Sequence, residues 1–243
     1  MSSRRVDGLL TAPPGLFVTG TDTEVGKTVL ASAVAATLAA AGRRVRVFKP
    51  AVTGLDEVDG ERAPDHELLR MAAASPQAED SISPYRFGPA VSPHLAAAEA
   101  GIQIEPLRLV AGCRRAAEGG DVLVVEGVGG LMVPLARDYL VRDLAAAVGF
   151  PLLVAARPGL GTISHTLMTI ECARAAGLYV RAVVLTPWPE SPSTVERSNM
   201  QTLAELGELD VFGLPRQDPA RPAAVATLPV ERWLGPPRPA LAA

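Results

Sequence analysis

The sequence predicts an α/β protein with a single domain, in which a mostly parallel β-sheet has helices on both faces. Short, predominantly apolar runs alternate with helical stretches, and glycine-rich turns follow several of these runs. Strands buried on both faces of a parallel sheet have this continuous apolar character, and their alternation with helices is typical of α/β folds. With 48% hydrophobic residues and only 4% aromatic residues, the 243-residue chain can bury a sizeable core of Ala, Val and Leu.

The expected strands are, in chain order, 16–18, 45–48, 122–125, 152–155 and 182–185, with a sixth at 211–214. Helices are expected over 26–41, 64–74, 93–100 and 107–118. The first helix carries almost no charge, and a helix that is apolar all round is buried. Gly42 is a suitable C-cap for it. No repeat or linker interrupts the pattern, so we expect one domain over 15–234, between flexible tails at 1–14 and 235–243.

Charge and hydropathy exclude several classes of partner. The net charge is −3 and no basic field is present, whereas nucleic-acid binding needs clustered Lys and Arg. No apolar run approaches the ~20 residues that span a bilayer, and the N-terminus lacks the apolar segment of a secretory signal. We therefore expect a soluble cytoplasmic protein that binds neither nucleic acid nor membrane.

The most informative segment is residues 19–28, which read Thr-Gly-Thr-Asp-Thr-Glu-Val-Gly-Lys-Thr. Gly26-Lys27-Thr28 opens a helix directly after a strand, which is the context of a phosphate-binding P-loop. Backbone N–H groups of such a loop surround phosphates, Lys27 would neutralise them, and Thr28 would offer its hydroxyl to Mg²⁺. The alternative is a helix start that happens to contain Lys, and Gly20 lies one position earlier than the usual pattern requires. The expected architecture is thus of the P-loop NTPase type.

Two further charged residues end predicted strands. Glu126 follows Val124-Val125 and precedes three glycines within four residues, and Lys49 ends the second strand before Pro50. Ligand sites of open α/β sheets lie at the carboxyl edge of the strands, where an acidic residue suits a Mg²⁺ ligand. The alternatives are a strand-end Glu that bonds a turn and a solvated Lys.

Together these residues resemble the dethiobiotin synthetase family over about residues 15–217. The resemblance rests on the stretch from Gly20 to Thr28, on Lys49-Pro50 with Thr53-Gly54, on Ser92-Pro93-His94 and on Val125 through Gly130. The displaced glycine, which departs from the usual P-loop pattern, belongs to the family's own motif. The order and spacing of the four motifs make coincidence very improbable.

The resemblance implies a reaction. Dethiobiotin synthetases join CO₂ to 7,8-diaminononanoate with ATP and Mg²⁺ and release dethiobiotin, ADP and phosphate. A carbamate forms on one amine, its oxygen takes the γ-phosphoryl group, and the second amine closes the cyclic urea. Positioning and positive charge dominate phosphoryl transfer, and the substrate's own amines are the nucleophiles. The histidines are therefore expected to be unreactive, with His94 and His165 as local hydrogen-bonding groups and His66 on the surface.

The resemblance also implies roles for individual positions. Lys27 and Lys49 match catalytic lysines, and Thr28, Asp65 and Glu126 match the Mg²⁺ ligands. Substrate contacts are implied at Thr23, Lys49 and Thr53, and at the helix start Gly161, Thr162, Ile163 and Ser164, which receives the substrate carboxylate from the partner subunit of a homodimer. A free helix N-terminus favours an anion. Nucleotide contacts are implied for Glu24, Val25, Gly26, Lys27, Thr28, Val29, Asp65, Glu126, Gly127, Val128, Gly129, Thr186, Pro187, Leu214, Pro215 and Arg216.

The base-reading position departs from the better-known family pattern. Many members carry Asn-Asp after the fifth strand, where the Asn amide reads adenine, but this chain has Thr186-Pro187. Thr186 lacks the paired donor and acceptor of an amide, and Pro187 has no N–H. The nucleotide is therefore ATP or another triphosphate, with backbone groups near Leu214-Pro215-Arg216 as the alternative reader of adenine.

Two rival functions share features of this sequence. A partitioning-type P-loop ATPase switch carries an extra Lys early in the loop, where this chain has Thr21, Asp22 and Thr23. An amide-forming synthetase that acts on corrinoid carboxylates usually carries a glutaminase domain, for which this chain is too short. Phosphate release that depends on diaminononanoate distinguishes the synthetase from the switch.

Overall fold

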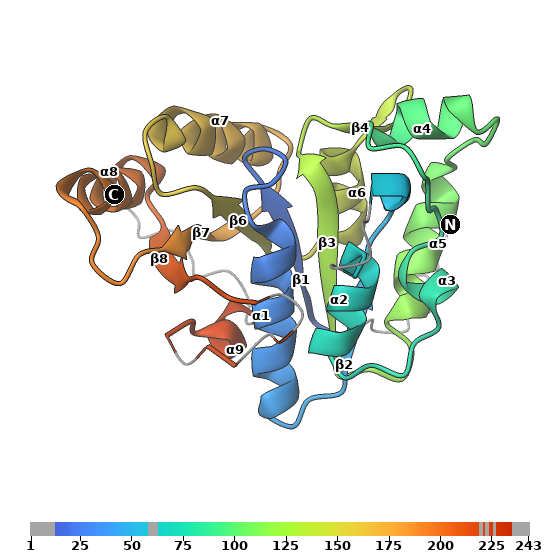
Figure 1. Ribbon diagram of the computed structural model, residues 1–243, viewed down its shortest axis with the longest axis horizontal. Helices are drawn as coiled ribbons and strands as arrows, with labels where there is room; N and C mark the ends of the chain where they lie inside the picture. The colour runs from blue at the N-terminus through green and yellow to red at the C-terminus, as the bar shows by residue number, and fades with distance from the viewer. Residues whose placement is uncertain (1–12, 58–62, 219–220, 222–223, 226, 235–243) are drawn as a thin grey trace, which may run out of the picture.

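The computed structural model describes residues 13–57, 63–218, 221, 224–225 and 227–234. A six-stranded sheet, parallel at every pairing, runs through them in the order β2-β3-β1-β6-β7-β8 (Figure 1). Its strands are β1 (Gly15–Gly20), β2 (Val45–Phe48), β3 (Val122–Gly130), β6 (Leu152–Ala156), β7 (Val180–Trp188) and β8 (Asp210–Pro215). The predicted α/β class and all six predicted strands are confirmed. The predicted tails lie almost wholly outside the described residues.

Helices cover both faces of the sheet (Figure 1). One face carries α1 (Lys27–Ala40), α2 (Asp65–Ala72), α3 (Glu79–Ile82) and α9 (Val230–Trp233), and the other carries α5 (Pro106–Ala116), α6 (Val141–Val148), α7 (Thr162–Ala175) and α8 (Thr194–Gly207). The remaining elements are α4 (Pro93–Glu99), the short 3-10 helix η1 (Leu55–Glu57) and a hairpin of β4 (Pro134–Ala136) and β5 (Tyr139–Leu140). The four predicted helices are confirmed. Among the described helices none is long and apolar enough to cross a membrane.

The sheet separates two apolar cores, which explains the continuous apolar strands. On β1, Leu16 and Val18 pack toward α1, whereas Phe17 between them packs into the opposite core. Successive side chains of a strand point to opposite faces, so a strand with a core on each side needs apolar residues at every position. The helix α1 is almost completely enclosed, with Leu30 and Leu38 fully buried.

Strand β3 is longer than predicted. It continues past Glu126 to Gly130, which pairs with Gly20 of β1 after an irregularity in the register. The expected end at residue 125 is therefore wrong. Glycines lower strand propensity and often mark a close backbone approach, and here the added residues extend the sheet edge beside the phosphate loop. Glu126 thus lies inside a buried strand.

Candidate active site

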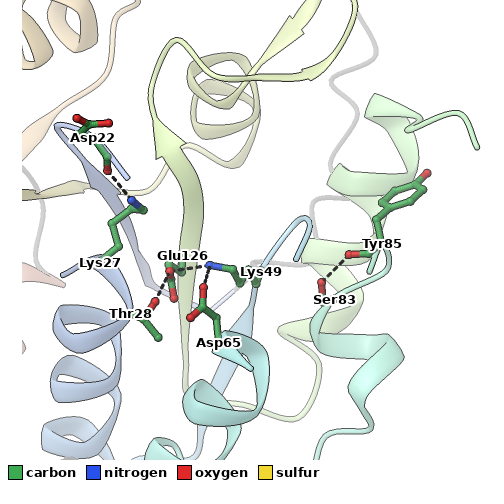
Figure 2. A network of polar contacts seen from close by, with 8 residues as sticks. All are labelled: Asp22, Lys27, Thr28, Lys49, Asp65, Ser83, Tyr85 and Glu126. Carbon is green, nitrogen blue, oxygen red and sulfur yellow. Dashed lines mark hydrogen bonds and ion pairs between the residues drawn. The ribbon is translucent and has the colours of Figure 1, made fainter. Parts of the chain in front are cut away.

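The loop between β1 and α1 requires a glycine at position 26. Gly26 has φ 89°, and a Cβ at this position would lie 2.5 Å from Cγ2 of Thr186. Only glycine adopts this conformation freely and accepts such a close neighbour. The Nζ of Lys27 donates a 2.6 Å hydrogen bond to the carbonyl of Asp22, across the loop (Figure 2). The strand–loop–helix context predicted from the sequence is therefore present.

Four polar side chains meet beside this loop (Figure 2). The Nζ of Lys49, one residue beyond β2, lies 2.7 Å from Oε1 of Glu126 and 2.9 Å from Oδ2 of Asp65. The hydroxyl of Thr28 donates to the same Oε1 of Glu126 over 2.9 Å. Neighbouring strands β2, β3 and β1 carry Lys49, Glu126 and the loop with Thr28 to one place, and α2 adds Asp65 at its first residue.

This cluster is buried and highly charged. Glu126 is 0% exposed and Lys49 is 3% exposed, and buried charges persist only when they are paired. Burial opposes the charge of Lys49, but Asp65 and Glu126 raise its pKa above the usual value. Burial raises the pKa of Glu126, and Lys49 opposes this shift. The two alternatives, a solvated Lys49 and a Glu126 that bonds only a turn, are therefore wrong.

Burial also affects the loop lysine. It lowers the pKa of Lys27 to about 8, and the positive charge of Lys49 acts in the same direction, whereas Glu126 and Asp65 oppose it. A cation held in a site of low polarity interacts strongly with an incoming anion. An anion bound at this loop would therefore favour the charged form of Lys27.

The oxygen ligands of this cluster fit a Mg²⁺ ion. Thr28, Asp65 and Glu126 provide a hydroxyl and two carboxylates, and Mg²⁺ is bound in proteins through few such oxygens together with waters and substrate phosphates. Oε2 of Glu126 is buried and has no hydrogen-bond partner among the described residues. A buried oxygen without a partner is costly, and a cation would satisfy it.

Other predicted contact residues lie around the loop. Thr23 is exposed, and its Cγ2 is 3.8 Å from where a Cβ on Gly129 would lie, so the loop and the end of β3 approach each other there. Thr53 is half-buried on the segment after β2. Among the remaining positions, Val25 and Gly127 are buried, Val29 and Val128 are half-buried, and Glu24 is exposed.

The positions proposed to read the base lie on adjacent strands. Thr186 is 2% exposed and packs on Gly26. Trp188 pairs with Pro215 of β8. Pro187, Pro215 and Arg216 are exposed, whereas Leu214 is buried. Thr186 and the end of β8 therefore belong to neighbouring strands of the sheet.

The start of α7 stands on the other side of the phosphate loop from the charged cluster. Strand β6, which precedes α7, neighbours β1 on the side away from β3 and β2. Gly161 is the N-cap with φ 90°, Thr162 is buried, Ile163 is half-buried and Ser164 is exposed. The structure of one chain thus does not bring these residues to Lys49.

His66 is not a surface residue, contrary to the prediction. It is 2% exposed because α2 turns this side chain inward, and burial lowers its pKa, an effect that Arg86 strengthens. Sequence reasoning also missed Arg157, which donates to the carbonyl of Glu24 in the phosphate loop, and Asn199, which donates to the carbonyl of Pro158 between β6 and α7. Arg157 directly follows an apolar strand, as Lys49 does, so the same signal could have found it.

This fold and site define a P-loop ATP-binding α/β protein, and a family model described as an AAA domain matches residues 14–223. The ATP-dependent dethiobiotin synthetase of Bacillus subtilis is 34% identical over 200 residues, which cover 82% of this chain and 86% of that protein. The Anaeromyxobacter dehalogenans (strain 2CP-1) protein of the same name is 45% identical over 171 residues, covering 70% of this chain and 75% of that protein. The chain belongs to the dethiobiotin synthetase family and is a ligase.

A solved structure resembles the chain more remotely. It is the septum site-determining protein MinD with Mg-ADP from Pyrococcus horikoshii, at 15% identity and a TM-score of 0.48, covering 84% of this chain and 82% of that chain. A likeness this distant carries no argument about function and does not favour the partitioning-type switch.

Proposed function

We propose that this chain carboxylates 7,8-diaminononanoate with CO₂ and closes the ring to dethiobiotin, using ATP and Mg²⁺, as a cytoplasmic enzyme of biotin biosynthesis. The observation that carries the proposal is Lys49, buried between Glu126 and Asp65 beside a Gly-Lys-Thr phosphate loop. Family membership supports the same reaction. No covalent nucleophile is required, because the two substrate amines form the new bonds.

The proposed roles follow the charges of the site. Lys27 neutralises the β- and γ-phosphoryl oxygens, and Lys49 stabilises the carbamate and the phosphoryl group that moves to it. The carbamate oxygen attacks the γ-phosphorus and ADP leaves. The second amine then attacks the carbonyl of the mixed anhydride, and phosphate leaves as the cyclic urea forms. Thr23 and Thr53 contribute hydroxyl groups to the substrate. Electrostatic stabilisation of this kind usually contributes most to such catalysis.

Thr28, Asp65 and Glu126 would hold Mg²⁺. When bound, the ion would neutralise charge that develops on the phosphates. The chain's own contribution is to keep these oxygens in place: Lys49 bonds both carboxylates, and Thr28 bonds Glu126.

Product analysis tests the proposed reaction. The chain is incubated with ATP, Mg²⁺, bicarbonate and 7,8-diaminononanoate, and phosphate and dethiobiotin are quantified, the latter by mass spectrometry. We expect equal amounts of the two products, each dependent on diaminononanoate. Phosphate release at the same rate with and without diaminononanoate, and with no dethiobiotin formed, would instead support the nucleotide-driven switch.

We further propose a homodimer in which the start of α7 completes the partner's substrate site. Leu160, Met168 and Met132 are 97%, 59% and 57% exposed around this helix, and exposed apolar groups that gather on one surface mark interaction sites. A hollow of about 370 Å³ lies between the phosphate loop, the end of β3 and α7. The substrate carboxylate would meet the free N–H groups of Gly161 through Ser164.

Met168→Glu is expected to split this dimer and to weaken diaminononanoate binding more than nucleotide binding. The new carboxylate would have to lose water in the interface, which is strongly unfavourable. Sedimentation velocity reports the assembly, and calorimetry reports the two affinities. Leu107→Glu on α5, where the leucine is 83% exposed, is the matched control. A stable monomer with full activity would refute the shared site.

We predict weak discrimination among nucleobases. Thr186 packs on the phosphate loop, Pro187 has no N–H, and neither can copy the two-sided hydrogen bond of an amide. Rejection of a wrong partner by several kcal/mol requires such a specific polar contact. The phosphates, which carry the chemistry, bind in the same loop for every base.

The kcat/KM values for ATP, CTP and GTP at saturating diaminononanoate are therefore expected to lie within about tenfold of one another, roughly 1.4 kcal/mol. A preference for ATP above a hundredfold would mean that backbone groups near Leu214, Pro215 and Arg216 read the adenine edge.

A further inference from the structure

The loop between β6 and α7 is held in place from α8. The side-chain Nδ2 of Asn199 donates to the carbonyls of Pro158 and Gly159 over 2.9 and 3.2 Å. Asn199 is only 6% exposed, and asparagine is an unfavourable residue within a helix unless its amide has a specific partner. This amide fixes the backbone of an otherwise exposed loop, whose tip Leu160 is 97% exposed.

The same loop reaches the phosphate loop through Arg157. This residue directly follows β6, and its guanidinium Nη2 donates to the carbonyl of Glu24 over 3.4 Å. Asn199 bonds the carbonyl of Pro158, the residue after Arg157. It therefore fixes the backbone position from which the Arg157 side chain extends. A chain of contacts therefore runs from α8 through Asn199 and Arg157 to the phosphate loop.

Glu24 is a non-glycine residue of the phosphate loop with an unfavourable backbone conformation. Its φ is 52°, in the left-handed region, which non-glycine residues adopt rarely and at an energetic cost. A trans peptide places its C=O and N–H on opposite sides. With the Glu24 carbonyl turned out toward Arg157, the N–H of Val25 turns to the other side of the peptide plane. Within the described residues no backbone carbonyl accepts a hydrogen bond from that N–H.

We infer that Arg157, held by Asn199, is a positioning residue that orients the Glu24–Val25 peptide so that the phosphate loop is preorganised for nucleotide. Neither side chain is assigned to the reaction by the motifs of the family. The inference rests on the nucleotide site of the proposed function. It requires no contact between Arg157 and the nucleotide, because the effect passes through the backbone of the loop.

Calorimetric titration with Mg²⁺ and ADP, at one fixed ionic strength, tests the inference. Arg157→Ala is expected to weaken nucleotide binding by about three- to tenfold, the net effect of one hydrogen bond. Asn199→Leu removes no charge, yet it is expected to weaken binding in the same direction. Arg157→Lys keeps a cationic donor and should restore most of the affinity.

Two control variants separate positioning from charge and from general stability. Arg181→Ala, like Arg157→Ala, removes one guanidinium charge and one hydrogen bond to a backbone carbonyl. Arg181 donates that bond to the carbonyl of Arg232. Leu203→Ala removes a fully buried side chain one helical turn after Asn199 on α8. Both controls should bind ADP within twofold of the wild type.

The double variant Arg157→Ala with Asn199→Leu is decisive. If both residues act through one contact, the affinity of the double variant for ADP should equal that of whichever single variant binds ADP more weakly. Additive losses, or normal binding by Asn199→Leu, would overturn the inference. If Asn199→Leu does not fold, hydrogen exchange at the Val25 amide in Arg157→Ala replaces it, and unchanged exchange would overturn the inference equally. A wild type that binds no ADP would instead contradict the proposed function.

Discussion

Lys27→Ala is expected to lower kcat for dethiobiotin formation by about 10²–10³-fold, the usual loss for one preorganised charge partner of a transition state. Lys27 is buried at the phosphate loop, and its Nζ is held by the carbonyl of Asp22. Lys27 is only 8% exposed, so little solvent can reach this position to replace the lost charge. Single-turnover measurements with saturating ATP and diaminononanoate report the chemical step.

Thermal denaturation provides the control for this substitution. Lys27 is not part of the buried ion pair between Lys49 and Glu126, so removing it should leave the fold intact. A Lys27→Ala variant that folds and keeps more than half of the wild-type rate would refute the assignment of this loop. Lys27→Arg keeps the positive charge but replaces the compact ammonium group with a larger guanidinium. It should therefore bind nucleotide better than Lys27→Ala does.

The fold was predictable because its strands carry an unusually clear pattern. A sheet with a core on each face needs apolar residues at every strand position, as Leu16, Phe17 and Val18 illustrate. Where the strand composition changes, the prediction failed: Gly127, Gly129 and Gly130 continue β3, although glycine normally argues against a strand. The hairpin of β4 and β5 is too short to produce a periodic signal.

The cluster was predictable for a topological reason. Lys49 and Glu126 end apolar runs, and the carboxyl ends of parallel strands meet at one edge. The sequence could not show that Lys49 would lie between two carboxylates, because that depends on the position of α2, which brings Asp65. It also could not show which face of α2 is buried, so His66 was placed wrongly. Asn199 contacts only backbone carbonyls, which leave no motif in the sequence, whereas Arg157 could have been found from its place directly after an apolar strand.

Lys49→Ala is expected to lower kcat by at least about 10²-fold while leaving nucleotide affinity nearly unchanged. Lys49 lies on the cluster side of the site, bonded to Glu126 and Asp65, whereas Lys27 and the loop backbone are the proposed holders of the nucleotide. Calorimetry with a nonhydrolysable ATP analogue separates the two effects. Collapse of nucleotide affinity with carbamate chemistry preserved would show that the proposed role of Lys49 is wrong.

The buried ion pair adds a second, independent consequence of the same substitution. Without Lys49, the fully buried Glu126 loses its cation, and breaking a buried pair costs about 3–5 kcal/mol of unfolding free energy. Mg²⁺ bound by Thr28, Asp65 and Glu126 would replace that cation, so it should raise the Tm of Lys49→Ala by more than it raises the Tm of the wild type. Lys49→Met, which keeps the apolar stem without the charge, should behave in the same way. Equal Mg²⁺ effects on the Tm of all three proteins would mean that the ion does not bind at Glu126.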